Sequence, residues 1–353
     1  MKKSILAMLL AIATITSFAT VRTVSNSPFG GAQYSTLLAA YTAASNGDTL
    51  HVEGTNVTYT LGQNGGWAKS LTVIGIGFNA NKQNPGKTYI SFAHSGSQSS
   101  QFSMFIGGSG SSFYGINFTG IVSTVGGVSN VLFANCTFPS YVYLQQSASG
   151  ITIRNSIFTQ LNNLNIIVDA APSVYSGVSV SNCVFNGYIS GSSNPNVSMN
   201  VDHCLFLGQV GNNLIQLQNA TISNNIFMNS FIGGSNINCN FLNNICNVAG
   251  TFPPAGNIGS NNIAATNPNM VNYTLNTFYS TTHNYNLQAG SAAIGTGTLL
   301  SDIGVHGGAS MFFSEQGEVL INPIMREVSI LSPTVTPSGT LNVKIIATKP
   351  KDN

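Results

Sequence analysis

The sequence predicts an all-β fold, a single-stranded parallel β-helix of about nine or ten coils, because one short pattern returns along most of the chain at a spacing near 20 residues. Two clear copies are GITIRNSIFTQ at 150–160 and GVSVSNCVFNG at 177–187. Each copy alternates apolar and polar residues over four or five positions, as does a strand with one buried face. The sixth letter of each copy is a polar residue, and after it the apolar residues of a second strand begin. Two strands therefore meet at a bend, and the rest of the period allows a third.

The sixth letter of the repeat predicts a ladder of polar side chains at that bend. In six successive copies this letter is Asn135, Asn155, Asn182, His203, Asn224 and Asn243. Equivalent positions of a parallel β-helix lie one above the other, about 4.8 Å apart, so we expect these six residues to form one inward column. An Asn side chain can both donate and accept hydrogen bonds, and a neutral His can do the same. The column would satisfy backbone groups at the bend that are otherwise buried without partners.

Charge is scarce in this chain. Charged residues make up 6% of it, about a quarter of the usual share. Between Lys87 and Asp302 the charged residues are Arg154, Asp169 and Asp202 alone. The formal net charge of +2 comes from the two ends of the sequence, so it does not indicate a nucleic-acid partner. Disordered chains carry more charge and fewer β-branched and aromatic residues, which argues against disorder.

The first residues have the pattern of a secretory signal peptide. Lys2 and Lys3 precede an apolar stretch, and residues 17–19 fit a small-x-small cleavage site. We therefore expect residues 1–19 to be a signal peptide and the mature protein to be exported. An N-terminal membrane anchor is the alternative, but Thr and Ser residues interrupt a stretch that is already short for a bilayer span. No other segment of the sequence is apolar enough to cross a membrane.

Two further stretches carry a resemblance to a known superfamily. In STLLAAYTAASNGDTLHV at 35–52, Ser35 or Thr36 can cap a short helix with an apolar side, and HNYNLQAGSAAIGTGTLLSDIGVHGG fills 283–308. Together with the Asn-bend repeat, they resemble the right-handed parallel β-helix proteins of the pectate-lyase-like superfamily. The second stretch is similar to the closing segment of exported bacterial surface proteins called choice-of-anchor Q proteins.

The resemblance implies a right-handed β-helix over residues 20–310 and a location that is secreted or at the bacterial cell surface. It also implies that a short helix at 35–46 caps the open end of the apolar bore, since terminal repeats need caps. Residues 311–353 differ in composition, and a turn signal at 337–339 separates two apolar stretches. We expect a small C-terminal β-hairpin extension there, which either packs on the last coil or docks a partner.

The chemistry of the superfamily's enzymes is largely missing from the coils. Its lyases need a metal or an Arg together with a strong base, and its hydrolases need paired carboxylates. If the protein is active, Arg154 and Asp202 are the expected catalytic residues, but the repeat places them on the outward face two coils apart, roughly 10 Å. Calcium binds several oxygen ligands, usually including carboxylates, and the coils offer only Asp169 and Asp202. No metal site and no cofactor is therefore predicted.

The adjacent residues Asp202, His203 and Cys204 have the residue types of a metal or nucleophile cluster. Neighbouring residues of a strand point in opposite directions, so we expect that the three side chains do not converge. His203 is then a member of the bend column. The five cysteines of the chain fall at packing positions of the repeat and are odd in number, which favours buried free thiols over the disulfides of exported proteins.

The outward face of the coils offers two candidate ligand-binding features. Thr152, Ser179, Asn200, Thr221 and Asn240 should form a column of small polar residues. Tyr141 and Tyr143 share one strand face, and exposed aromatic rings can stack on sugars.

The main functional hypothesis is an exported, non-catalytic β-helix of the surface or extracellular matrix, with polysaccharide or cell-surface matrix as the candidate partner. A polysaccharide lyase or glycoside hydrolase of the pectate-lyase-like superfamily is the alternative, because β-helices host many functions. An ice-binding face is a third reading, which the mixed composition of the polar column disfavours.

Overall fold

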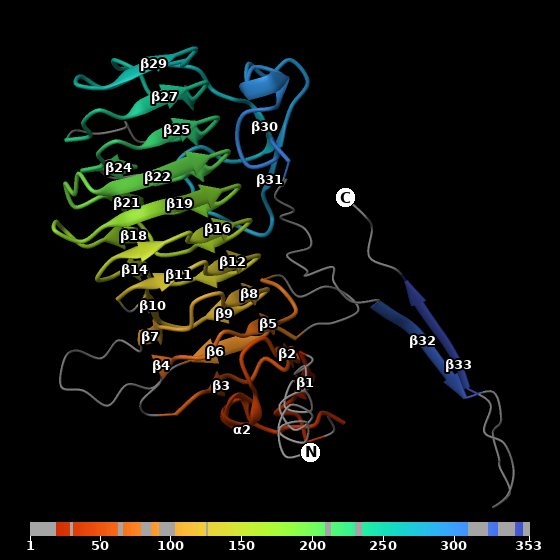
Figure 1. The fold of residues 1–353 in the computed structure, drawn as a ribbon. Helices are drawn as coiled ribbons and strands as arrows, with labels where there is room; N and C mark the ends of the chain where they lie inside the picture. Colours follow the sequence, from red (N-terminus) through yellow and green to blue (C-terminus); the bar gives the residue numbers. More distant parts are fainter. Residues whose placement is uncertain are drawn as a thin grey trace, which may run out of the picture.

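The computed structural model describes residues 19–28, 31–62, 66–78, 86–91, 103–124, 126–208, 213–229, 235–309, 324–330 and 343–348. The predicted signal peptide lies outside these residues except for Ala19. Within the described residues the chain winds into a stack of coils with very little helix (Figure 1).

Three sheets run along the stack. Sheet A contains β1 (Val21–Val24), β2 (Thr49–Val52), β5 (Thr72–Ile74), β8 (Ser112–Tyr114), β12 (Leu132–Ala134), β16 (Thr152–Arg154), β19 (Tyr175–Ser181), β22 (Val197–Asp202), β25 (Thr221–Ser223), β27 (Asn240–Leu242) and β29 (Ile258–Ser260), with β11 (Val128–Ser129) and β15 (Ala148–Ser149) beside this path. Sheet B contains β3 (Tyr59–Thr60), β6 (Tyr89–Ser91), β9 (Asn117–Phe118), β13 (Thr137–Phe138), β17 (Ile157–Phe158), β20 (Val184–Phe185), β23 (Leu205–Phe206), β26 (Ile226–Phe227) and β28 (Ile245–Cys246). Sheet C contains β4 (Gly66–Trp67), β7 (Ser103–Ile106), β10 (Ile121–Thr124), β14 (Val142–Leu144), β18 (Leu164–Val168), β21 (Tyr188–Ser190) and β24 (Leu214–Ile215).

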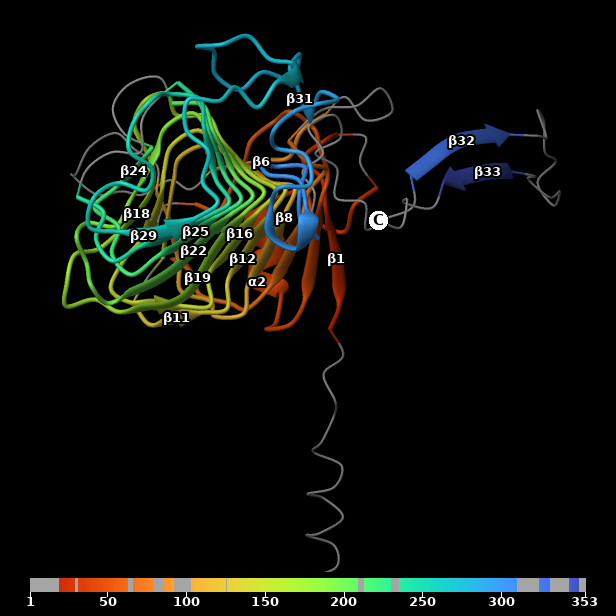
Figure 2. The same cartoon turned by 90° about the horizontal axis from the view of Figure 1, so that it is seen from above.

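Neighbouring coils pair in parallel in all three sheets. Among the described residues, seven coils each contribute a strand to sheet A, then to sheet B, then to sheet C, and two more, with β25–β26 and β27–β28, supply sheets A and B. Seen from above, the coils lie over one another in a shared outline (Figure 2). The predicted all-β parallel β-helix is therefore confirmed.

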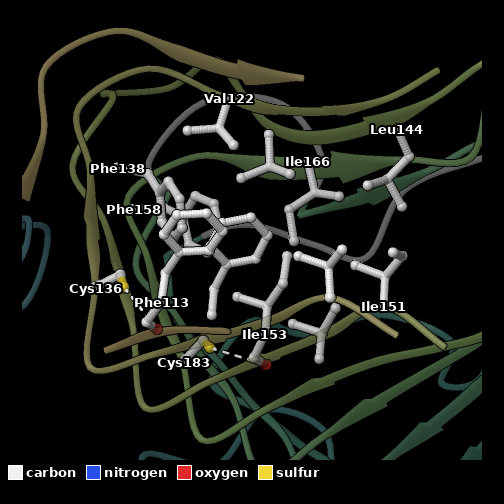
Figure 3. Packing of buried hydrophobic residues seen from close by; sticks show 14 of the residues in the cluster. Phe113, Val122, Cys136, Phe138, Leu144, Ile151, Ile153, Phe158, Ile166 and Cys183 are labelled. Atoms are coloured by element: carbon white, nitrogen blue, oxygen red, sulfur yellow. Dashed lines mark hydrogen bonds between the residues drawn. The ribbon is translucent and has the colours of Figure 1, made fainter. Parts of the chain in front are cut away.

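The bore of the stack is filled by columns of like side chains, as the repeat predicts. Six Phe rings stack along sheet B with centroid spacings of 4.6 to 5.2 Å: Phe118, Phe138, Phe158, Phe185, Phe206 and Phe227. Cys136 and Cys183 lie next to these rings (Figure 3). All five cysteines are buried and unpaired, so the prediction of free thiols is confirmed. Burial raises the pKa of the Cys136 thiol to about 12.

Helix α2 (Leu37–Ala43) packs on the first coils. The Thr36 side chain caps its N-terminus by accepting a hydrogen bond of 3.2 Å from the backbone of the first turn, and Leu37 and Ala40 are fully buried in the core. At the other end, Lys69 Nζ donates to three backbone carbonyls at 2.7 to 3.0 Å. A cation at this end suits the partial negative charge of a helix C-terminus.

Residues 268–309 form an outer layer that the sequence analysis did not predict. It contains the antiparallel strands β30 (Met270–Asn272) and β31 (Asn284–Leu287) and the 3₁₀ turn η1 (Thr298–Leu300), and it lies beside the stack (Figure 1). Its Met270, Tyr285, Ala293, Ile303 and Val305 pack in one cluster with the outward residues of sheet B, namely Ile157, Val184, Leu205, Ile226 and Ile245. The paired apolar letters of these repeats are the signal of this second core, since one residue of each pair faces inward and the other outward.

Strands β32 (Ile324–Ile330) and β33 (Val343–Thr348) pair antiparallel, with Ile324 opposite Thr348. The turn between them lies outside the described residues. Among the helices that the structure describes, none is both long enough and apolar enough to span a bilayer.

Candidate functional site

The six predicted ladder residues all occupy the bend between sheets A and B. Their φ angles lie between 49° and 57°, in the left-handed region that Asn adopts more readily than most residues. This shared backbone conformation gives a physical reason for the recurrence of Asn at the sixth letter.

The side chains of at least four of these residues turn outward and contact the outer layer. Asn182 Nδ2 donates to the carbonyl oxygens of Val305 and Gly307 at 3.0 and 2.8 Å. Asn224 Oδ1 accepts from the Thr298 backbone N–H at 2.8 Å. Asn243 Nδ2 donates to Thr298 Oγ1 at 3.0 Å, and His203 contacts Ser301. The predicted inward ladder is therefore wrong for these four, because a left-handed residue interrupts the strand alternation on which the prediction rested.

An inward ladder exists one residue later in the repeat. Asn225 Nδ2 donates to Asn244 Oδ1 at 3.0 Å, and Asn244 Nδ2 donates to Asn262 Oδ1 at 2.9 Å. Asn225 Oδ1 also accepts from the backbone N–H of Cys204 at 2.8 Å. The Asn-Asn pairs of the last repeats are the signal that could have revealed this ladder: one Asn takes the bend, and the next lies in the bore.

Asp202 and His203 converge, contrary to the sequence prediction. His203 Nδ1 lies 2.7 Å from Asp202 Oδ2, and His203 Nε2 lies 3.1 Å from Ser301 Oγ. The two neighbours meet because His203 stands at the bend with φ 50° and so escapes strand alternation. Cys204 does point away, since it is fully buried in the bore. Ser301 comes from the outer layer, 98 residues further along the chain.

The side chains of Asp202, His203 and Ser301 lie at a cleft of about 470 Å³ between sheet A and the outer layer. Sheet A contributes Asn200, Asp202 and Ser223 to its lining, and the outer layer contributes Thr298, Leu299 and Ser301. The His203 side chain is 6% exposed and that of Asp202 27%. The cleft therefore combines a buried imidazole with a carboxylate and a hydroxyl that solvent can reach.

Asp202 is held in its ionised form. Burial alone would raise the pKa of its carboxyl group, but hydrogen bonds from His203, Ser223 and Asn224 hold the pKa below its ordinary value. Ser223 Oγ and Asn224 Nδ2 both donate to Oδ1, at 2.7 and 2.8 Å, which leaves Oδ2 for the imidazole. Because a carboxylate only accepts, Nδ1 of a neutral His203 carries the proton and Nε2 offers its lone pair to Ser301.

Arg154, the other expected catalytic residue, lies away from this cluster. It pairs in register with Ser181, and Ser181 pairs with Asp202, so two strand spacings separate Arg154 from Asp202, as the repeat predicts. Within the part of the chain that the structure describes, the ion pairs are Arg22 with Asp48 and His203 with Asp202, and neither includes Arg154.

The predicted ligand-binding tyrosines lie on β14 and just before it. Tyr141 and Tyr143 are half-buried, with ring centroids 6.3 Å apart. Tyr143 donates a short hydrogen bond to Asp169 Oδ1, which raises the pKa of the phenol to about 12. This bond fixes the Tyr143 ring on the outer side of sheet C, a different sheet from the one that lines the cleft.

The described residues contain no group of three or more His, Cys, Asp and Glu side chains placed to hold a metal ion. The fold defines the chain as a parallel β-helix with an outer layer. No family model matches it, and no curated protein matches it. Among solved structures, the crystal structure of pectate lyase Pel9A is similar, with a TM-score of 0.48 and 17% sequence identity, over 83% of this chain and 97% of that one.

Proposed function

We propose that this chain is an exported β-helix of the bacterial cell surface or extracellular matrix that binds polysaccharide and does not cleave its glycosidic bonds. The observation that carries the proposal is the polar column on sheet A. Thr152, Ser179, Asn200, Thr221 and Asn240 follow one another in strict register, and all are partly or fully exposed. Hydroxyl and amide groups repeated along an uncharged surface suit the hydroxyl groups of a glycan chain.

The same surface lacks the charges that glycosidic cleavage uses. Glycosidases work with two carboxyl groups on either side of the bond, and acid–base groups must reach the reacting atoms. Asp202 is engaged by His203, and Arg154 stands two strands away. A lyase or hydrolase acting through Arg154 and Asp202 remains the alternative that the experiments below separate.

Affinity electrophoresis through gels that contain acidic or neutral polysaccharides tests the binding. Wild-type protein is expected to be retarded by at least one of them. Thr221→Glu places a charge in the middle of the column and should reduce retardation, whereas Thr281→Glu, the same change at an exposed position of the outer layer, should not. Retardation that survives Thr221→Glu but disappears in Tyr141→Ala would place the glycan on the tyrosine pair. Equal mobility of all proteins in every gel would contradict the proposal.

A further inference from the structure

Ser301, His203 and Asp202 have the mutual geometry of a hydrolytic triad. The distances from Ser301 Oγ to His203 Nε2 and from His203 Nδ1 to Asp202 Oδ2 are 3.1 and 2.7 Å. Separations of about 2.6–3.2 Å between nucleophile, base and orienting group are those of an activated nucleophile. From this arrangement at the mouth of a cleft, we propose that the protein hydrolyses carboxylic esters with Ser301 as nucleophile, His203 as base and Asp202 as the residue that orients the imidazole.

The imidazole is held in place from more than one side. Gly307 packs against the ring: a Cβ atom there would lie 2.6 Å from His203 Cδ2 and 1.8 Å from the Asp302 carbonyl oxygen, so this position accepts only glycine. Ser223 and Asn224 in turn hold the Asp202 carboxylate, by donating hydrogen bonds to its Oδ1. Catalytic groups need such rigid positioning, because small displacements of the reacting atoms cost large factors in rate.

Ser301 follows a turn with an unusual backbone. Leu299 and Leu300, directly before it, have φ angles of 55° and 61°, although left-handed backbone is unfavourable for a leucine. The two residues are 97% and 83% exposed. Residues held in such conformations cluster at functional sites, and the turn both presents the serine and places the apolar Leu299 in the cleft lining.

The reaction balances with water as the only co-reactant. Ser301 Oγ attacks the ester carbonyl carbon while its proton passes to His203 Nε2. The bond between the acyl carbon and the alcohol oxygen then breaks, and His203 returns the proton to the departing alcohol. A water molecule, deprotonated by His203, cleaves the acyl-serine to a carboxylic acid and free Ser301. Asn200, whose side-chain amide can donate a hydrogen bond, also lines the cleft.

The position of the cleft indicates where such an ester is carried. Asn200 belongs both to the cleft lining and to the polar column on sheet A. A glycan chain lying along the column would bring acyl groups on its hydroxyls past Ser301. The substrate class is therefore an O-acylated polysaccharide, a conclusion that rests on the proposed function, whereas ester hydrolysis itself rests on the triad alone.

Two assays on the full chain test the triad. We expect wild-type protein to hydrolyse p-nitrophenyl acetate and to react with a fluorophosphonate probe at Ser301, as located by peptide mass spectrometry. Ser301→Ala and His203→Asn should lower the hydrolysis rate by roughly 100-fold or more and abolish labelling. His203→Asn introduces the residue that other coils carry at this bend, so the fold is expected to persist. Ser198→Ala, at an exposed position on the strand that carries Asp202, β22, should leave both readouts unchanged.

A purely structural role for the cluster predicts a different pattern. In that case Ser301→Ala would lower thermal stability, but wild-type protein would neither label nor hydrolyse the ester faster than the variant, and this result would overturn the proposal. Release of acetate from acetylated polysaccharide then tests the substrate class separately from ester hydrolysis by the triad. Hydrolysis of p-nitrophenyl acetate without retention of any glycan would refute the polysaccharide function and leave the triad standing.

Discussion

At the scale of single residues, one backbone angle decides where the polar side chains of each coil go. A left-handed residue at the sixth letter turns Asn182 and Asn224 toward the outer layer and sends the next residue, such as Asn225, into the bore. If strand alternation continued through this position, the inward ladder would stand one residue earlier, and the side chains of Asp202 and His203 would point in opposite directions.

The inward ladder should be important for stability. Asn244 Nδ2 donates to the carbonyl of Ile222 at 2.8 Å, and its Oδ1 accepts from the Asn225 backbone at 2.9 Å. Leucine is similar in size but leaves these buried groups unpaired, so Asn244→Leu is expected to lower the free energy of unfolding by about 1–3 kcal/mol. Asn240→Leu, on the outward face of the same coil, should change it by less than about 0.5 kcal/mol. Equal losses in urea unfolding of the two variants would disprove the ladder.

At the scale of elements, the first strand is fixed by one buried carboxylate. Asp48 accepts hydrogen bonds from the Thr20 and Ser45 backbones at 2.8 and 3.0 Å and from Arg22 Nε at 3.0 Å. Burial alone would raise the pKa of Asp48, but these hydrogen bonds and the charge of Arg22 hold it below its ordinary value. Strand β1, at the edge of sheet A, is thereby tied to the loop that leads into β2.

This lowered pKa makes the contribution of Asp48 depend on pH. A carboxyl group with a lowered folded pKa stabilises the fold above its unfolded pKa, and this stabilisation is lost as the pH falls through the folded value. Asp48→Asn is therefore expected to cost about 1–3 kcal/mol at neutral pH, and the difference from wild type should shrink as the pH falls below 3.8. Urea unfolding across this range measures it. A difference that stays constant with pH would mean that the charge of Asp48 does not contribute.

At the scale of the whole molecule, the fold was predictable because its information is local and repeated. The period near 20, the Phe columns, the free cysteines and the helix capped by Thr36 all follow from short stretches of sequence. The cleft was not predictable, because it depends on a contact between His203 and Ser301, 98 residues apart, and on the packing of an outer layer that does not share the repeat. The apolar pairs on sheet B are a signal that this face is covered, but they do not identify the residues that cover it.

The central claim, that this β-helix binds polysaccharide without breaking its backbone, is tested most directly by the chain length of the glycans it retains. Purified protein is incubated with acidic and neutral polysaccharides, and size-exclusion chromatography is combined with assays for reducing and unsaturated ends. We predict that chain length and both kinds of end stay unchanged while bound glycan is recovered. Shortening that disappears in Arg154→Ala would assign glycosidic cleavage to the coil wall, and shortening that survives this change would place it elsewhere. Either result would contradict the claim.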